Sequence, residues 1–350
     1  MRVLVTGHNG YIGSVMVPVL RAAGHEVSGL DTYFFEDCGV SDDEQPPVPC
    51  VRKDLRDVTI EDLRGFDGVV HLAALCNDPL GDLNAGWTHD INHAASYRLA
   101  KLSSEAGVRR FVYASSCSMY GAAGQELVTE AAQLSPLTPY AVSKVRAEQD
   151  IGKLASADFS PVFMRNATAY GMSPRLRADV VLNNLVCWAY TTGKIRIMSD
   201  GTPWRPIVHI EDIARAAAAA LVAPREAIHN EAFNVGANDE NYQVRDLARI
   251  VQETVPGCEV EYAAEGGPDP RSYRVDFGKL TRHLPDFRPK WSAALGAQQL
   301  FEAVRRAGLT LEDFQSRKFI RLPQLKHLLD TNRLDDTLRW RKTAEGAANV

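Results

Sequence analysis

The feature that most constrains the fold is a glycine-rich turn close to the N-terminus. Residues 6–13 read TGHNGYIG and lie between an apolar run and a segment with helical apolar periodicity. In a strand–turn–helix unit, Gly7 permits the tight turn, Gly10 lets the backbone approach a phosphate group, and Gly13 lets the helix pack closely on the strand. The unpaired N–H groups and partial positive charge of the helix N-terminus favour an anion here. We therefore expect a dinucleotide pyrophosphate to contact Gly7, Asn9, Gly10, Tyr11, Ile12 and Gly13.

The end of the second apolar run supports this expectation. Asp31 directly follows residues 27–30, which read VSGL. A carboxylate at this point can accept both hydroxyl groups of an adenosine ribose and would repel a 2′-phosphate. No Arg or Lys follows in residues 32–35 to neutralise such a phosphate. Taken alone, the G-x-x-G-x-x-G spacing also suits an ordinary turn, and Asp31 also suits a turn cap, but the two together predict NAD rather than NADP as the cofactor.

The composition argues against several classes of function. A net charge of −5 over 350 residues argues against a nucleic-acid partner or an anionic membrane surface. The six cysteines are scattered and form no C-x-x-C pair, which predicts a reducing compartment and neither a disulfide framework nor a metal site. The chain begins directly with a predicted strand, and its apolar runs are far shorter than a membrane span, so we expect a cytoplasmic protein.

Short β-rich runs alternate with amphipathic helical segments over the first half of the chain. This alternation predicts an α/β fold, a doubly wound parallel sheet of the Rossmann type with helices on both faces. The predicted strands lie near 2–6, 26–31, 49–52, 68–73, 110–115 and 161–165, and the predicted helices near 11–23, 88–106 and 138–156.

Beyond the sixth predicted strand the pattern loosens, and loops rich in Gly and Pro separate shorter elements. We expect a dinucleotide-binding domain at 1–168, to which 204–235 returns. Residues 169–203 and 236–350 would form a second, smaller α/β substrate lobe with a helical C-terminal extension. Within it, the stretch 310–340 is rich in Leu and Arg and gives no indication of its function. Further helices are predicted at 179–191, 210–223, 243–254 and 293–307, and strands at 195–198, 207–209, 231–235 and 259–262.

A Tyr-x-x-x-Lys pair supplies the candidate chemistry. Tyr140 and Lys144 lie one turn apart on one face of a predicted helix, and the fifth predicted strand ends in ASSCSMYG at 114–121. A free tyrosine has a pKa of about 10, so it needs the Lys144 ammonium beside it to act as a base near neutrality. Ser116 would hydrogen-bond the same phenolic oxygen, and Lys144 would also anchor the nicotinamide ribose. A surface helix pair is the alternative explanation of the Tyr-x-x-x-Lys spacing by itself.

Together these motifs resemble those of the extended short-chain dehydrogenase/reductase family, in its NDP-sugar epimerase/dehydratase branch. The resemblance covers roughly residues 1–280. It rests on TGHNGYIG, Asp31, Asp54-Leu55, HLAA at 71–74, SSCSMYG at 115–121, YAVSK at 140–144, WRPIVHIED at 204–212 and FNVG at 233–236.

The resemblance implies further roles in cofactor binding. The pair Asp54-Leu55 would lie near the adenine, the HLAA strand end would line the cofactor, and Asn92 would support the crevice of the sheet. It also implies Ser116, Tyr140 and Lys144 as the catalytic triad. The implied cofactor residues beyond the glycine turn are Asp31, Asp54, Leu55, Leu72, Ala73, Ala74, Asn92, Ser115, Tyr140 and Lys144.

The two positions after Ser116 separate the reactions of similar proteins. The family's 4,6-dehydratases carry Asp-Glu there, and its decarboxylases and GDP-mannose dehydratases carry Glu at the second position. This chain has Cys117-Ser118, which disfavours dehydration and decarboxylation. The GDP-fucose synthase-like members place an acidic cysteine at the second position, so Cys117 is one place early for that role. A small buried side chain is favoured over a substrate contact at Cys117, although Cys117 is kept among the candidate substrate residues.

Two departures from the family pattern concern the substrate diphosphate. Thr168 replaces an asparagine in R-x-x-N-x-Y-G, and the arginine usual before a late G-D turn is missing at 265–269. Arg205 matches an arginine that binds the diphosphate. The missing diphosphate contacts would be replaced by Arg271, Arg274, Arg175 or Arg177, unless these arginines are surface charges. The sugar would be contacted by Asn77 or Asp78, unless these residues form an ordinary turn. The candidate substrate residues are Asn77, Cys117, Ser118, Thr168, Arg175, Arg205, Arg271 and Arg274.

The leading expectation is an NAD-dependent nucleotide-sugar epimerase acting at C4 through a transient 4-keto sugar. Alternatives are a nucleotide-sugar 4-dehydrogenase or keto-reductase, a 3- or 5-epimerase, and a non-catalytic NAD-sensing scaffold. The resemblance also implies a homodimer formed through the helices at 88–106 and 138–156.

Overall fold

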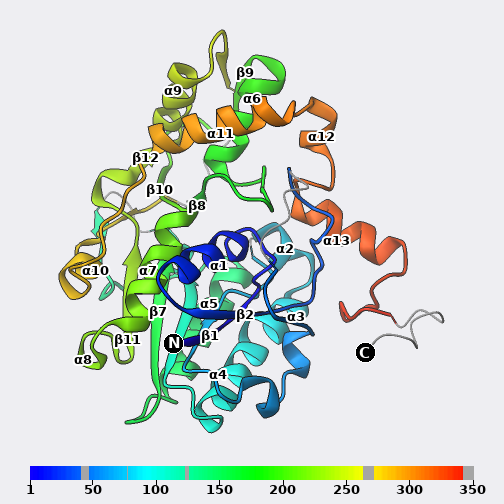
Figure 1. The fold of residues 1–350 in the computed structure, drawn as a ribbon. Coiled ribbons are helices and arrows are strands. Elements are labelled where there is room, and N and C mark those ends of the chain that lie inside the picture. Colours follow the sequence, from blue (N-terminus) through cyan, green and yellow to red (C-terminus); the bar gives the residue numbers. More distant parts are fainter. Residues whose placement is uncertain (41–46, 77, 123–125, 263–271, 342–350) are drawn as a thin grey trace.

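A computed structural model describes residues 1–40, 47–76, 78–122, 126–262 and 272–341. Its centre is a parallel seven-stranded sheet in the order β11-β7-β5-β4-β1-β2-β3 (Figure 1). The chain runs outward from β1 in both directions, so the order reverses between β1 and β4, and a crevice opens there at the carboxyl ends of the strands. The strands are β1 (Arg2–Thr6), β2 (Glu26–Asp31), β3 (Cys50–Arg52), β4 (Gly68–His71), β5 (Arg110–Ser116), β7 (Ser160–Asn166) and β11 (Glu231–Val235).

Helices cover both faces of this sheet, which confirms the predicted doubly wound fold. On one face, α1 (Gly13–Ala22) and α7 (Ile210–Val222) pack against Val3 and Val5 of β1. On the other face, α4 (Ala95–Glu105) and α5 (Pro139–Gly152) share a core with Leu4 of the same strand. Successive side chains of a strand point to opposite faces, and burial on both sides explains why these strands read as continuous apolar runs.

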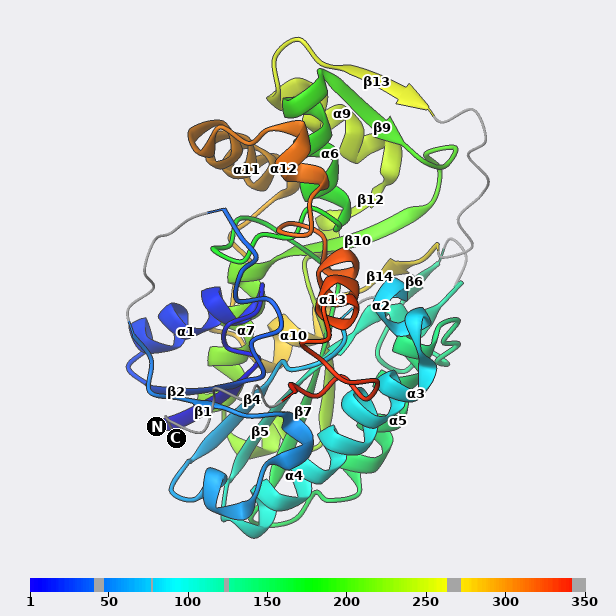
Figure 2. The ribbon, with the colours of Figure 1, turned by 90° about the vertical axis from the view of Figure 1, so that its right-hand side faces the viewer.

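A smaller lobe lies beyond the carboxyl ends of the strands (Figures 1 and 2). It contains a three-stranded sheet, β12-β10-β8, and a two-stranded sheet, β13-β9, packed with helices around one core. Its elements are β8 (Thr168–Tyr170), α6 (Val181–Thr192), β9 (Lys194–Ile197), β10 (Trp204–His209), β12 (Asn241–Gln243), α9 (Val244–Thr254), β13 (Glu259–Tyr262), α11 (Ala293–Ala307) and α12 (Leu311–Gln315).

Two elements differ from the sequence expectation. The strand predicted at 207–209 is part of β10, which joins the sheet of the smaller lobe, whereas α7 and β11 do return to the large domain. The helix predicted at 88–106 is interrupted by a π-helical turn, η3 (His89–Ala94), which follows α3 (Ala85–Thr88). The remaining short elements are η1 (Leu55–Asp57), η2 (Ile60–Leu63), α2 (Asp78–Leu83), η4 (Cys117–Tyr120), β6 (Leu127–Val128), α8 (Arg225–Ile228), η5 (Asn238–Glu240), β14 (Arg274–Val275) and α10 (Gly278–His283).

The C-terminal part of the chain turns back from the smaller lobe and runs down the large domain. We call residues 316–341 the C-terminal strap; it contains α13 (Arg321–Asp330) and is drawn in orange and red in Figure 2. Leu325 and Leu328 of α13 share a buried cluster with Phe34 after β2 and Leu80 of α2. The stretch without an assigned function therefore packs on loops of the dinucleotide-binding domain. No helix among the described residues is long and apolar enough to cross a membrane.

Candidate active site

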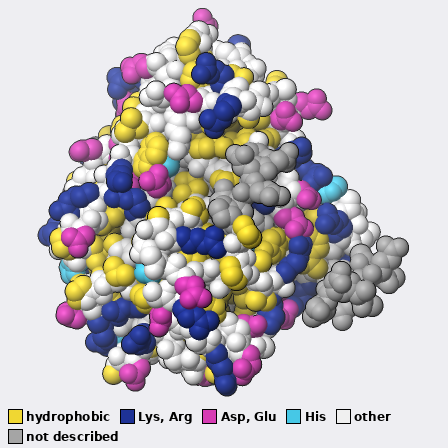
Figure 3. Space-filling model, viewed as in Figure 1, with side chains coloured by type: hydrophobic (Ala, Val, Ile, Leu, Met, Phe, Trp, Pro, Cys, Tyr) yellow, Lys and Arg dark blue, Asp and Glu magenta, His cyan; other side chains and the backbone are white. Residues whose placement is uncertain are grey.

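One large cavity, of about 940 Å³, lies between the strand ends of the large domain and the smaller lobe. On the face drawn in Figure 3, hydrophobic side chains gather across the middle of the molecule, at the level where the two parts meet. The sequence-predicted site residues that line the cavity are Gly7, Asn9, Gly10, Tyr11, Ile12, Gly13, Asp31, Asp54, Leu55, Leu72, Ala73, Ala74, Ser115, Ser116, Ser118, Tyr140, Lys144, Thr168 and Arg205.

The glycine turn has the close backbone approaches that its sequence predicts. Gly7 has a φ of +75°, and a Cβ added to it would lie 2.9 Å from the Ala73 nitrogen. A Cβ on Gly13 would lie 2.1 Å from the Gly7 carbonyl oxygen, which no real side chain tolerates. Among the described hydrogen bonds, the backbone N–H groups of Tyr11 and Ile12 donate to no carbonyl, and they precede the first turn of α1. This cradle fits a pyrophosphate.

The acidic residue after β2 is tied to the same turn. The Asp31 carboxylate accepts hydrogen bonds from the backbone N–H groups of Asn9, at 3.0 Å, and Tyr33, at 2.8 Å. Burial raises the pKa of Asp31, and these N–H donors oppose the rise. Asp54 lies beside it in the cavity and pairs with Arg56 at 2.6 Å. The residues present therefore fit the adenosine half of a dinucleotide.

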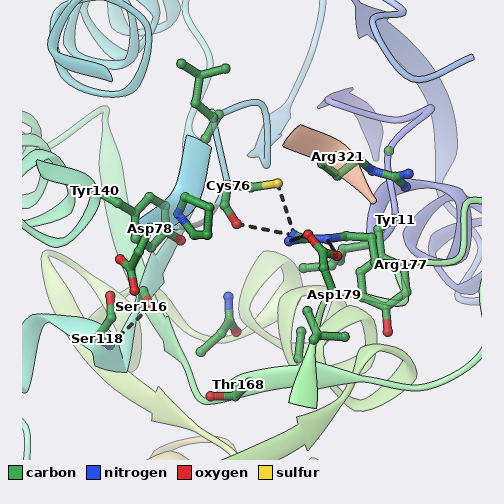
Figure 4. Close-up of a pocket in the computed structure, with 18 of the residues that line it drawn as sticks. Tyr11, Cys76, Asp78, Ser116, Ser118, Tyr140, Thr168, Arg177, Asp179 and Arg321 are labelled. Carbon is green, nitrogen blue, oxygen red and sulfur yellow. Dashed lines mark hydrogen bonds and ion pairs between the residues drawn. The ribbon is translucent and has the colours of Figure 1, made fainter. Parts of the chain in front are cut away.

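The three predicted catalytic side chains meet at the end of β5. Tyr140 sits in the first turn of α5, whose N-cap Thr138 accepts from the Ala141 N–H, and its side chain lies next to the Ser116 hydroxyl (Figure 4). The Lys144 ammonium donates to the Ala114 carbonyl at 2.7 Å.

The charge state of this group differs from the sequence expectation. Burial raises the pKa of Tyr140, with smaller opposing effects from Ser116 and Arg177, and the Lys144 nitrogen lies 5.7 Å from the centre of the Tyr140 ring. Burial also lowers the pKa of Lys144 to about 8. Lys144 by itself therefore does not bring the pKa of the phenol to neutrality, because its ammonium is desolvated and directed at a carbonyl.

Four candidate residues do not line the cavity. The Cys117 side chain is fully buried and its thiol donates to the Arg165 carbonyl, so the expected substrate contact is wrong. Asn92 supports the crevice indirectly, through hydrogen bonds to the backbone N–H and carbonyl of Leu75. Arg175 donates hydrogen bonds to the Asn9 side chain. The Arg274 guanidinium stacks on the Trp204 ring. Asn77 and Arg271 lie outside the described residues.

Three further side chains line the cavity without being among the candidate site residues predicted from the sequence: Cys76, Arg177 and Arg321. Arg177, weighed only as an alternative, is buried, pairs with Asp179 at 2.9 Å and donates to the carbonyl and thiol of Cys76. Arg321 of the strap lies beside Tyr11 (Figure 4). The sequence offered Arg177 as a positive charge near a family motif. Neither Cys76 nor Arg321 belongs to a motif that would have indicated a place in the site.

The crevice brings together a pyrophosphate cradle, a carboxylate placed for a ribose and a Ser-Tyr-Lys group. These features are typical of a nicotinamide-dependent enzyme of the short-chain dehydrogenase/reductase class. The profile of the NAD dependent epimerase/dehydratase family matches residues 3–236, and the chain belongs to that family. It is accordingly an enzyme with NAD as its cofactor.

Individual relatives differ in the reaction that they catalyse. The chain is 30% identical over 306 residues to a UDP-glucose 4-epimerase of Corynebacterium glutamicum, covering 81% of this chain and 90% of that protein. It is 25% identical to UDP-glucuronic acid decarboxylase 2 of Arabidopsis thaliana over 336 residues, covering 91% and 69%. Among solved structures, MoeE5 in complex with UDP-glucuronic acid and NAD superposes with a TM-score of 0.76 at 28% identity, covering 88% of this chain and 100% of that one.

Proposed function

We propose that this protein is a nucleotide-sugar epimerase that inverts C4 through a transient 4-keto sugar. The observation that carries the proposal is the surroundings of Ser116. The position directly after it, Cys117, faces the protein core, and the next, Ser118, lines the cavity with an uncharged side chain whose hydroxyl oxygen is buried. An acid–base pair for eliminating water is therefore absent from these two positions, which leaves Tyr140 as the proton-transferring group beside Ser116. The similarity to a UDP-glucose 4-epimerase supports the same reaction.

In this proposal each catalytic side chain has a defined role. Tyr140 takes the proton of the 4-hydroxyl group and later returns it, while Ser116 holds the phenolic oxygen by a hydrogen bond. Lys144 supplies positive charge behind the phenol and holds the nicotinamide ribose. Bound NAD would supply a reversible hydride acceptor for C4 and a positive charge beside the phenol. Tyr140 is half-buried at the cavity wall, so a bound substrate would shield the proton that it carries from bulk water.

The positive side chains of the cavity fit the substrate diphosphate. Arg205 of β10 and Arg177 line its lobe side, together with the hydroxyl of Thr168. Guanidinium groups bind phosphate oxygens with paired N–H donors, and a partly enclosed site strengthens that interaction. Because UDP is the nucleotide of the UDP-glucose 4-epimerase substrate and of the ligand bound to MoeE5, we propose a UDP-hexose as the substrate.

The test is to identify the nucleotide bound to the purified protein and then to incubate NDP-hexoses with it in D2O. NMR should show the C4 epimer without deuterium on carbon, because the hydride stays within the site. Tyr140→Phe should lower turnover by about a hundredfold or more, the range of a lost acid–base group. Unchanged turnover in this variant would favour the scaffold interpretation.

A second candidate is epimerisation at C3 or C5. Asp78 lines the cavity close to Tyr140, and its carboxylate accepts a hydrogen bond from Thr138 at 2.7 Å. A carboxylate there would remove a proton from a carbon next to the 4-keto group. Deuterium at C3 or C5 of the product would support this candidate and refute simple 4-epimerisation.

We also propose that the protein is a cytoplasmic homodimer, paired through α4 and α5. These helices carry the expected interface, and Tyr97 of α4 is exposed. Sedimentation of the holoenzyme should give twice the monomer mass. A monomer at micromolar concentration would contradict the pairing.

A further inference from the structure

The C-terminal strap closes over the cofactor end of the cavity, and several bonds hold it there. The Trp340 indole donates to the Thr32 carbonyl at 2.6 Å, directly after Asp31. Arg56, which pairs with Asp54, also donates to the carbonyls of Thr337 and Leu338 at the far end of the strap. The strap is therefore bonded to both segments that would hold the adenosine.

The charged residue of the strap that faces the cavity is Arg321, in the first turn of α13. It is 2% exposed, and its guanidinium lies over the Phe35 ring at 4.9 Å. One nitrogen, Nη2, donates to the Arg175 carbonyl at 2.6 Å, and the other, Nη1, has no hydrogen-bond partner among the described residues.

Arg321 also lacks a negative partner. No carboxylate of the described residues forms an ion pair with it, and the Asp179 carboxylate, which acts on its charge from a distance, is already paired with the neighbouring Arg177. Burial lowers the pKa of Arg321, which shows how poorly the surroundings stabilise its charge. A buried guanidinium without a counter-charge is costly, so its retention at this place calls for an anionic ligand.

The place of that anion is given by the neighbours of Arg321. Its acceptor Arg175 hydrogen-bonds the Asn9 side chain, and its charge acts on the phenol of Tyr11. Both belong to the glycine turn, and Figure 4 shows Arg321 on the side of the cavity away from Tyr140 and Ser116. The turn offers N–H donors to an anion but no side-chain cation, and Arg321 would supply one.

We propose that Arg321 is a ligand of the cofactor's pyrophosphate, and that the strap thereby holds NAD in its site through the catalytic cycle. The strap brings the charge from a part of the chain outside the family match, which ends at residue 236. This assignment depends only on NAD binding, so its tests are independent of which sugar reaction the enzyme catalyses.

The test compares Arg321→Met with Lys318→Met, which removes an exposed strap charge outside the cavity. The rate of NAD release from loaded protein should rise about ten- to a hundredfold in Arg321→Met and stay unchanged in Lys318→Met, as expected for a lost charge-assisted hydrogen bond. Equal release rates for wild type and Arg321→Met would overturn the proposal.

Smaller ligands separate a pyrophosphate contact from simple packing. In protein stripped of NAD, Arg321→Met should weaken ADP-ribose by the same factor but leave adenosine and UDP within about twofold. Equal losses for ADP-ribose and adenosine would mean that the residue only positions the strap. A loss for UDP with ADP-ribose unchanged would mean that it binds the substrate diphosphate instead. Either result would refute the assignment.

Stability without cofactor gives a readout independent of ligand affinity. Because the unpaired charge is lost, the melting temperature of stripped Arg321→Met should equal or exceed that of stripped wild type. The rise in melting temperature on adding NAD should be smaller in the variant. A stripped variant that melts well below the wild type, with an unchanged NAD response, would contradict the proposal.

Discussion

Replacing Lys144 with methionine should remove a pH-dependent cost of burying an ammonium group. The pKa of Lys144 falls from the usual 10.5 to about 8 in the folded chain, because burial disfavours its charge. The unfolded chain then binds more protons between these values, so stability rises with pH through this window. At one pKa unit per 1.36 kcal/mol, burying the charged form costs about 3 kcal/mol below pH 8 and nothing well above pH 10.5.

The assay is urea unfolding of cofactor-free wild type and Lys144→Met near pH 6.5 and near pH 9.5. The wild type should gain about 2 kcal/mol more than the variant over this interval, because the methionine side chain of the variant has no proton to lose. Other titrating groups are shared by the two proteins and cancel in the comparison. Lys290→Met, at an exposed position, serves as the control and should behave like the wild type. A difference below about 0.5 kcal/mol would refute the reasoning that Lys144 is charged and desolvated at neutral pH.

Two other substitutions test the fold around the site. Gly13→Ala should weaken NAD binding more than about tenfold by isothermal titration, because the added Cβ would clash with the Gly7 carbonyl. The control is Gly24→Ala, where the added Cβ meets open space. This variant should lose only about 1 kcal/mol of stability and bind NAD normally. Glu148→Ala should lower the free energy of unfolding by about 3–5 kcal/mol, because it removes the carboxylate that pairs with the buried Arg165 guanidinium. The control, Asp150→Ala, breaks an ion pair at the surface and should lower the free energy of unfolding by under about 1 kcal/mol. Normal NAD affinity in Gly13→Ala, or equal losses in Glu148→Ala and Asp150→Ala, would contradict these arguments.

The parts of the site that sequence predicted are those fixed by local geometry. The turn at Gly7 and Gly13 and the spacing of Tyr140 and Lys144 each depend on a few neighbouring residues, and they lie as expected. The direction of the Cys117 side chain could not be predicted, since it depends on an Arg165 carbonyl from another strand.

Long-range packing explains the other differences. The residues 207–209 were expected to form a strand, and they do, but their partners β8 and β12 are set by tertiary contacts. The leucines of α13 indicate an apolar helix face, but they do not indicate what that face packs against. Its partner Phe34 lies far away in the sequence, so the contact could not be predicted. Arg321 looked like any surface arginine, because burial cannot be read from a charge in an amphipathic helix.

The strap is also the final part of the described chain to leave the ribosome. The glycine turn, Asp31 and the Tyr-Lys helix can all assemble while residues 316–341 are still being synthesised, so a nascent chain presents an open site. Cofactor captured at that stage would become enclosed only after the strap has emerged and α13 has docked. A fusion inserted directly after Arg341, the last described residue, would therefore interfere with loading of the enzyme rather than with its chemistry.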